Sequence, residues 1–133
     1  MSVLVDTSVI AAALSARDRL HARARRLLRE ILEGRWGPAY VTDYIVDEVL
    51  TYMLSRGGAE AALKAGRLLL ERRVFRILPV SIDVFLEAWR VFRENLPRLS
   101  FTDASTVAAA KAYSIDYIAT FDEDLASLHP SIP

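Results

Sequence analysis

Two aspartates of this chain come just after short apolar segments of strand length. Asp6 directly follows residues 3–5, and Asp122 follows residues 117–119 after two intervening positions. We predict that both segments are strands of a parallel sheet, because apolar, β-branched and aromatic residues dominate them. Ligands of open parallel sheets lie outside the carboxyl ends of the strands. Both carboxylates are therefore expected at that edge of the sheet.

Two further acids lie on predicted helices. Asp103 stands at the third helical position after Ser100, which resembles a capping box with Asp in place of Glu. Glu48 lies within the apolar stripe formed by Ile45 and Val49 on a predicted helix. Burying an unpaired carboxylate on the inward face of a helix costs free energy. The position of Glu48 therefore indicates a chemical role.

Acids that meet without a matching lysine or arginine repel one another. At ~4 Å two carboxylates cost roughly 1 kcal/mol in water, and several times that where the effective dielectric constant is near 20. A stable cluster therefore needs a bound cation or a raised pKa. Because carboxylate oxygens suit Mg²⁺ or Mn²⁺, the pattern predicts a site for one of these ions.

Each acid also has a purely local interpretation. Asp6 is placed to cap the helix that follows it, and Asp103 is a favourable acid in a first helical turn. Glu48 alone is typical of a partly exposed residue paired with arginine, while Asp122 and Asp124 are typical of turn residues. Their convergence at one sheet edge is what favours the metal site.

Apolar runs of strand length alternate with segments of helical period along the whole chain. Strands are expected at residues 3–5, 40–41, 74–80 and 117–119. Helices are expected at residues 8–14, 20–33, 43–55, 60–72, 82–96, 101–113 and 123–128. No hairpin signal separates the strands, which favours a small central parallel sheet covered on both faces. We predict a single three-layer α/β/α domain over residues 1–133.

Composition and charge narrow the function classes. The 133 residues include 17 Lys and Arg, 17 Asp and Glu, and no cysteine. Cysteine-based zinc sites are excluded, and zero net charge excludes a globally basic nucleic-acid-binding protein, although not a local basic patch.

No apolar run approaches the ~20 residues of a membrane-spanning helix, and the N-terminus lacks the features of a signal peptide. We therefore expect a cytoplasmic protein. The two histidines, His21 and His129, are expected at the surface and not as metal ligands.

Four short motifs, in this order along the chain, resemble the PIN-domain family: Val3-Leu4-Val5-Asp6-Thr7-Ser8, Asp47-Glu48-Val49-Leu50, Phe101-Thr102-Asp103-Ala104 and Ala119-Thr120-Phe121-Asp122. The chain is most similar to the toxin subunits of VapBC toxin–antitoxin pairs, from Val3 to about Leu128. The resemblance implies the same PIN-like fold. It also implies an endoribonuclease that depends on Mg²⁺ or Mn²⁺ and cleaves RNA phosphodiester bonds.

The resemblance assigns residues to that site. The acids that match the family's catalytic and metal-binding positions are Asp6, Glu48, Asp103 and Asp122. Asp124 is an alternative for the fourth acid, and we favour Asp122 because it stands in the Thr-x-Asp frame. The hydroxyl positions near the site, which are expected to orient carboxylates or water, are Thr7, Ser8 and Thr120.

An arginine-rich segment has two interpretations. Six arginines lie between residues 17 and 29, opposed there by Asp18. They form either a surface that contacts RNA phosphates or a solvated helix face. The candidates for RNA contact are Arg17, Arg19, Arg23 and Arg26.

The resemblance also implies partners: a homodimer and a cognate antitoxin protein. Tyr44, Leu50 and Leu54 are candidates for a hydrophobic groove or dimer face, whereas Trp89 and Phe92 are expected to pack internally. A competing interpretation is a non-catalytic RNA- or partner-binding PIN-like module with a structural metal. An aspartyl phosphatase is disfavoured because Ser8 stands where such enzymes carry a second aspartate.

Overall fold

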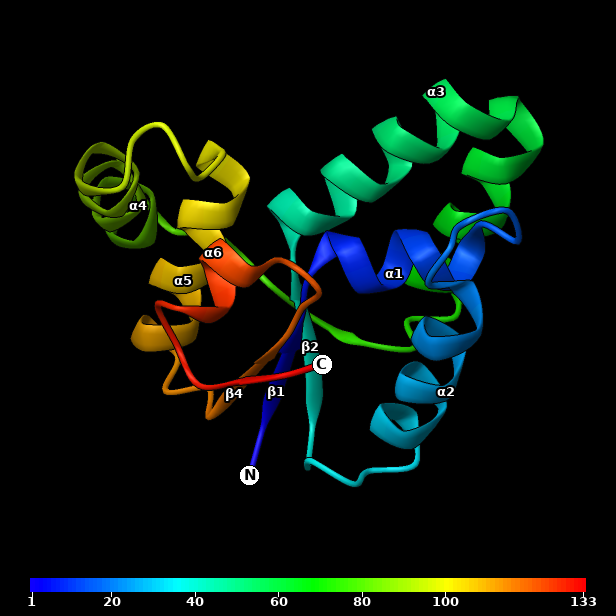
Figure 1. Ribbon diagram of the computed structural model, residues 1–133, viewed down its shortest axis with the longest axis horizontal. Coiled ribbons are helices and arrows are strands. Elements are labelled where there is room, and N and C mark those ends of the chain that lie inside the picture. Colours follow the sequence, from blue (N-terminus) through cyan, green and yellow to red (C-terminus); the bar gives the residue numbers. More distant parts are fainter.

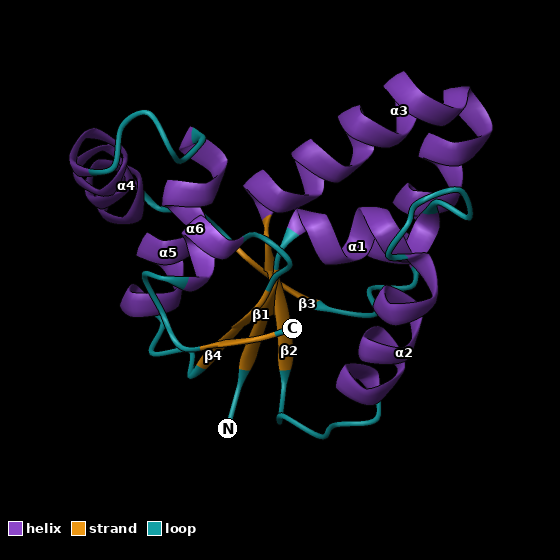
Figure 2. Ribbon diagram, viewed as in Figure 1, coloured by secondary structure: helices purple, strands orange, loops and turns teal.

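The computed structural model describes residues 1–133, and a five-stranded parallel sheet forms its centre (Figure 2). Its strands are β1 (Val3–Val5), β2 (Ala39–Thr42), β3 (Arg76–Leu78), β4 (Tyr117–Ala119) and β5 (Ser131–Ile132). Their order across the sheet is β3-β2-β1-β4-β5. The central strand β1 pairs with β2 and β4, so that Leu4 lies between Tyr40 and Ile118.

Helices cover both faces of this sheet. They are α1 (Thr7–Leu14), α2 (His21–Leu32), α3 (Asp43–Gly66), α4 (Ile82–Glu94), α5 (Phe101–Ala112) and α6 (Glu123–Ala126). A π-helical segment, Arg67–Glu71, follows α3. Helices α1 and α2 lie on one side of the sheet, while α4, α5 and α6 lie on the other (Figure 1). The predicted three-layer architecture is confirmed.

The core follows directly from the apolar runs of the sequence. All three residues of β1 are fully buried, as expected for a central strand covered on both faces. On α5 every residue from Ala104 to Ala110 is buried, and most of these are small. Small side chains let α4 pack closely against α5.

Four elements differ from the sequence-based expectations: α3, the π-helical segment, β3 and β5. The predicted helix boundary near residue 57 becomes a kink inside α3, where Gly58 has a φ of 78°. The helix predicted to reach residue 72 ends as the π-helical segment. Strand β3 is shorter than predicted at both ends: residues 74 and 75 form bends, and Pro79 follows Leu78. Strand β5 was missed because two residues at a sheet edge carry no periodic signal.

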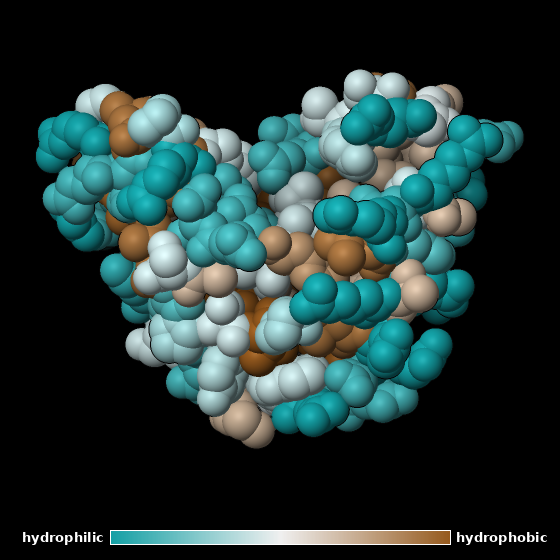
Figure 3. Space-filling model, viewed as in Figure 1, coloured by the Kyte–Doolittle hydropathy of each residue, from teal (hydrophilic) through white to brown (hydrophobic).

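Two groups of helices extend beyond the carboxyl ends of the strands. Helix α3 starts at the end of β2 and runs up one side, while α4 and the start of α5 stand on the other (Figure 1). The space-filling view shows a notch between the two groups, flanked by hydrophilic side chains (Figure 3). No helix of the protein is both long and apolar enough to cross a membrane.

Candidate metal-binding and active site

Asp6 is the most buried acid of the chain and lies at the carboxyl end of the central strand. Its side chain is 2% exposed. Oδ2 accepts hydrogen bonds of 2.8 Å from the hydroxyls of Ser8 and Thr120. Oδ1 is buried and has no hydrogen-bond partner. Although Asp6 occupies the N-cap position of α1, its side chain makes no capping bond there, so the local capping interpretation fails.

The backbone after β4 fixes the protons of both hydroxyls. The N–H of Phe121 donates to Ser8 Oγ at 3.1 Å, and the N–H of Asp122 donates to Thr120 Oγ1 at 3.0 Å. Because each hydroxyl oxygen accepts a backbone proton, its own proton is free to point at Asp6. The two hydroxyls therefore hold one carboxylate oxygen in place.

Electrostatics around Asp6 disfavour an isolated charge. Burial raises the pKa of Asp6 to about 6, while the hydrogen bonds from Ser8 and Thr120 oppose this increase and the charge of Asp103 adds to it. A buried carboxylate with an unpartnered oxygen and an acidic neighbour gains most from a nearby cation.

Asp103 combines the capping and the site interpretations. Its backbone N–H donates to Ser100 Oγ at 3.0 Å, and its Oδ2 accepts from the backbone N–H of Ser100 at 3.1 Å. The predicted capping box is therefore present. Burial raises the pKa of Asp103, and the negative charges of Asp122 and Asp124 raise it further.

Asp122 and Asp124 differ in their environments. Oδ1 of Asp122 accepts hydrogen bonds from the backbone N–H groups of Asp124 and Leu125, at 2.9 and 3.3 Å, and so caps α6. The carboxylate of Asp124 instead lies 3.9 Å from the guanidinium of Arg98. Asp122 lines the same cavity as Asp6, whereas Asp124 does not.

One cavity of about 420 Å³ brings the four predicted acids together at the carboxyl edge of the sheet. Glu48 reaches it from α3, half-buried and without the arginine partner of the local interpretation. No lysine or arginine lines it. The complete set of lining residues is Asp6, Thr7, Ser8, Ala11, Ala12, Asp18, Leu20, Glu48, Tyr52, Asp103, Phe121 and Asp122.

Sequence reasoning missed six of these residues, of which Ala11, Ala12 and Leu20 are aliphatic and Asp18, Tyr52 and Phe121 carry an acidic or aromatic group. Asp18 lies in the loop before α2, where no periodic signal marks it. Tyr52 lies one helical turn after Glu48, on the same face of the helix. Its position beside Glu48 could therefore have been predicted from the spacing. Phe121 lies inside the motif that identified Asp122, and its role in the wall of the cavity could have been inferred from that position.

Three carboxylates share one arrangement: a single oxygen is held by protein donors and the other accepts no hydrogen bond from the protein. The held oxygens are Oδ2 of Asp6, Oδ2 of Asp103 and Oδ1 of Asp122. Carboxylates that bind a metal are commonly anchored in this way. No three acidic or histidine side chains are packed tightly enough to surround an ion by themselves. Mg²⁺ usually keeps several waters and takes one or two protein carboxylates, so the donor set fits such an ion.

The remaining predicted site residues lie in three different settings. Thr7 lines the acidic cavity, but its hydroxyl is buried without a hydrogen-bond partner and so does not orient a carboxylate by hydrogen bonding. Arg19 and Arg23 line a neighbouring cavity, whereas Arg17 and Arg26 line neither of the two.

Both histidines are bound to the backbone. Nδ1 of His21 lies 2.9 Å from the carbonyl oxygen of Ala12, and Nε2 of His129 lies 2.9 Å from that of Ile115. Neither histidine lines the acidic cavity.

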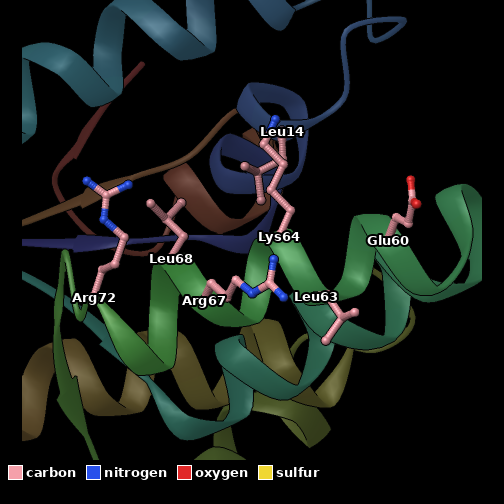
Figure 4. A pocket seen from close by; sticks show the side chains of 7 residues that line it. All are labelled: Leu14, Glu60, Leu63, Lys64, Arg67, Leu68 and Arg72. Carbon is pink, nitrogen blue, oxygen red and sulfur yellow. The ribbon is translucent and has the colours of Figure 1, made fainter.

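Two other cavities lie along the second half of α3. One, of about 690 Å³, is lined by Lys64, Arg67 and Arg72 together with leucines and Glu60 (Figure 4). The other, of about 510 Å³, is an apolar groove that includes Leu50 and Leu54 but not Tyr44. Neither brings several acids together, so the acidic cavity is the candidate active site.

Sequence comparisons place this architecture among known proteins. The PIN-domain family model matches residues 3–129. A VapC ribonuclease from Archaeoglobus fulgidus is 28% identical over 123 residues, which make up 89% of this chain and 76% of that protein. The 23S rRNA-specific endonuclease VapC20 of Mycobacterium tuberculosis is 30% identical over 130 residues, or 94% of this chain and 92% of that protein.

Structural comparisons agree. The crystal structure of Mycobacterium tuberculosis VapC20, described as a sarcin–ricin loop cleaving toxin, has a TM-score of 0.82 at 28% identity and covers 94% of this chain and 93% of its own. A toxin–antitoxin complex from Klebsiella pneumoniae has a TM-score of 0.70 at 20% identity, over 98% of this chain and 96% of its own. At that identity the second likeness concerns the fold alone.

Proposed function

The chain belongs to the PIN-domain family, and we propose that within this family it is a metal-dependent endoribonuclease and the toxin of a toxin–antitoxin pair. The observation that carries the proposal is the free oxygen of Asp6, which is buried without a partner in a cavity lined by further acids and by no cationic side chain. The ribonuclease names of two relatives, both similar over most of their length, support the same activity.

The proposed ion is Mg²⁺ or Mn²⁺. Asp6 and Asp103 would hold it, with Glu48 and Asp122 completing the acidic site through direct or water-mediated contacts. When bound, such an ion polarises a phosphodiester oxygen, activates water and stabilises the charge that develops on the leaving oxygen.

The chain's own residues prepare this site before substrate arrives. Ser8 and Thr120 hold Oδ2 of Asp6, so the carboxylate keeps one orientation in which Oδ1 has no protein donor. The capping box does the same for Asp103, and the α6 cap does it for Asp122. Carboxylates held in advance need no reorganisation during the reaction, and this is the main source of electrostatic catalysis.

The substrate class we propose is structured RNA. VapC20, the relative named for 23S rRNA cleavage, aligns with 94% of this chain, which makes a sarcin–ricin-type stem–loop the first substrate to test. The fold alone does not specify a substrate, so this choice depends on the relative's named target.

Two surfaces fit the proposed partners. The apolar groove, with Leu54 and Leu63 each 55% exposed, adjoins the cavity of Lys64, Arg67 and Arg72, and this suits an antitoxin segment that is apolar with acidic flanks. On α4, Ile82, Leu86 and Trp89 form an exposed apolar face, which we assign to a homodimer contact.

Cleavage assays test the activity directly. Purified protein is incubated with the labelled stem–loop in Mg²⁺, in Mn²⁺ and in EDTA, alongside Asp6→Asn, Asp103→Asn and Glu48→Gln. We expect cleavage with either ion, no cleavage in EDTA, and a loss of at least about 100-fold in the Asp6 and Asp103 variants. Asp47→Asn, which changes the exposed acid next to Glu48, is the matched control and should cleave normally.

The same assay distinguishes a metal-dependent ribonuclease from a non-catalytic RNA- or partner-binding module. A non-catalytic module with a structural metal would lose thermal stability in EDTA and would cleave nothing in any ion. Cleavage that persists in EDTA, or in Asp6→Asn, would contradict the metal-dependent site. The antitoxin is tested by co-expressing the chain with the product of the adjacent reading frame and asking whether the purified complex is inactive.

A further inference from the structure

A second cavity, of about 430 Å³, opens beside the acidic one. The two share a wall made of Leu20, Phe121 and Asp122. Arg19 and Arg23 line the second cavity, whereas the acidic cavity has no cationic side chain. If one phosphate of an RNA strand lies at the acidic site, the adjacent nucleotide is therefore placed near Arg19 and Arg23 across this shared wall.

Arg23 is held in a specific arrangement there. Its guanidinium carbon lies 5.1 Å from the centre of the Phe121 ring, so the planar group rests over an aromatic side chain. A guanidinium held over an aromatic ring by a cation–π contact can still donate its N–H groups to a phosphate, and together with the ring it offers a surface for a nucleobase. Arg23 forms no ion pair with the protein's own acids, which leaves its charge for a ligand.

Phe121 ties this pair to the reacting centre. Its backbone N–H donates a hydrogen bond to Ser8 Oγ, and the Ser8 hydroxyl in turn donates a hydrogen bond to Asp6 Oδ2. The ring is therefore anchored through one residue to the acid at the centre of the site. Asp122 and Glu123 also line the second cavity, but Asp122 belongs to the acidic site and Glu123 is exposed at the start of α6.

We propose that Arg23 stacked on Phe121, with Arg19 beside it, forms a subsite that binds the nucleotide next to the scissile phosphate of a single-stranded RNA segment. This inference rests on the proposed ribonuclease activity and deepens it. Under this proposal each interpretation of the arginine-rich segment holds for part of it. Arg19 and Arg23 contact RNA, and the other arginines form a solvated surface.

Binding without metal is the first test. A fluorescein-labelled single-stranded oligoribonucleotide is titrated in EDTA with wild-type protein, Arg23→Ala, Phe121→Leu and the double variant. Each single change should weaken binding roughly 5- to 30-fold, the range expected for one base-stacking or phosphate contact. The double variant should bind little worse than the weaker single variant, because the two side chains act as one unit.

Matched variants separate the subsite from general charge loss. Arg25→Ala removes the same charge from an exposed position on the same helix and should change binding less than twofold. Arg23→Ala should reduce the slope of log K against log salt by about 0.7, the value for one phosphate contact on a single strand. Arg23→Lys keeps the charge but not the stacking, so it should bind with intermediate affinity and a wild-type slope.

Cleavage kinetics complete the experiment. In Mg²⁺ the Arg23 and Phe121 variants should raise KM, with a much smaller effect on kcat, because neither side chain touches the reacting atoms. Circular dichroism melts show whether Phe121→Leu is folded, and Arg23→Ala tests the subsite independently of that core-adjacent change.

The outcomes distinguish this inference from the proposed activity. If wild type cleaves RNA while Arg23→Ala and Phe121→Leu bind like Arg25→Ala, the subsite is wrong and the ribonuclease assignment stands. If the variants lose binding while wild type cleaves no RNA, Arg23 and Phe121 form an RNA-binding contact, but the ribonuclease assignment fails and with it the placement of the subsite next to a scissile phosphate.

Discussion

The hydroxyl of Thr120 lies 2.8 Å from Oδ2 of Asp6, although 114 positions separate the two residues in the sequence. The contact exists because β4 pairs with β1 in parallel, which brings the residues that follow both strands to one edge. Ser8 makes the equivalent contact from α1. The central acid of the proposed site is thus oriented by segments from both ends of the chain.

Removing the Thr120 hydroxyl should weaken metal binding without unfolding the protein. In Thr120→Val, Asp6 loses one of two donors and its pKa rises further, so protons compete better with the metal. We expect the Mg²⁺ concentration for half-maximal cleavage to rise about 10-fold or more, and the acid limb of the pH–rate profile to move to higher pH.

Two controls accompany that change. Thr120→Ser keeps the hydroxyl and should restore wild-type metal dependence, while Thr51→Val alters an exposed threonine of α3 and should have no effect. An unchanged acid limb in Thr120→Val would contradict a positioning role for this residue.

The raised pKa of Asp6 predicts that the metal-free protein is destabilised as the pH increases from 4 to 6. Asp6 ionises near 3.8 when unfolded and at about 6 when folded, so within this range the folded state binds a proton that the unfolded state has lost. The destabilising contribution is absent below about pH 4 and complete above pH 6.

Asp6→Asn isolates this contribution, because it removes the buried charge and keeps the shape. In EDTA at pH 7 the free energy of unfolding of the variant should be higher than that of wild type by as much as roughly 3 kcal/mol. This value follows from the pKa shift of Asp6 at about 1.4 kcal/mol per pKa unit. The difference should vanish near pH 4. Denaturant melts at both pH values measure it, and equal stabilities at pH 7 would contradict the buried charge.

Asp122 and Asp124 form a matched pair of acids two positions apart. Asp122→Asn should lower cleavage by roughly 10-fold or more while leaving stability nearly unchanged, since asparagine caps helices about as well as aspartate. Asp124→Asn loses only a long contact with Arg98 and should retain most activity. Cleavage rates and thermal melts of both variants decide the assignment, and the reverse pattern would identify Asp124 as the fourth acid.

Charge placed on the exposed face of α4 should break self-association. Leu86 is 57% exposed there, one turn from Trp89, so Leu86→Glu costs little in the monomer but would bury a charge in a dimer. Light scattering should show wild-type dimers and Leu86→Glu monomers at micromolar concentration. Leu63→Glu, in the groove along α3, should remain dimeric; monomers in wild type would contradict the assignment.

Prediction succeeded where the signal was local. The strands β1 and β4 and the capping box of Ser100 and Asp103 follow from neighbouring residues. Trp89 fits the apolar stripe of α4 and was predicted to be internal, yet it is 48% exposed. That prediction was wrong because helical periodicity does not reveal where the covered part of a helix face ends.

The sequence by itself determined the three-layer architecture and predicted four acids for the site, because strand ends, helix stripes, caps and the family's short motifs are each encoded within a few residues. The tertiary structure decided which oxygen of Asp6 lacks a hydrogen bond, that the Thr7 hydroxyl has no hydrogen-bond partner, and that Arg23 lies over Phe121. These features depend on contacts between segments up to about a hundred residues apart. Only the packing of β1 against β4, and of α2 beside them, brings those atoms within hydrogen-bonding or stacking distance.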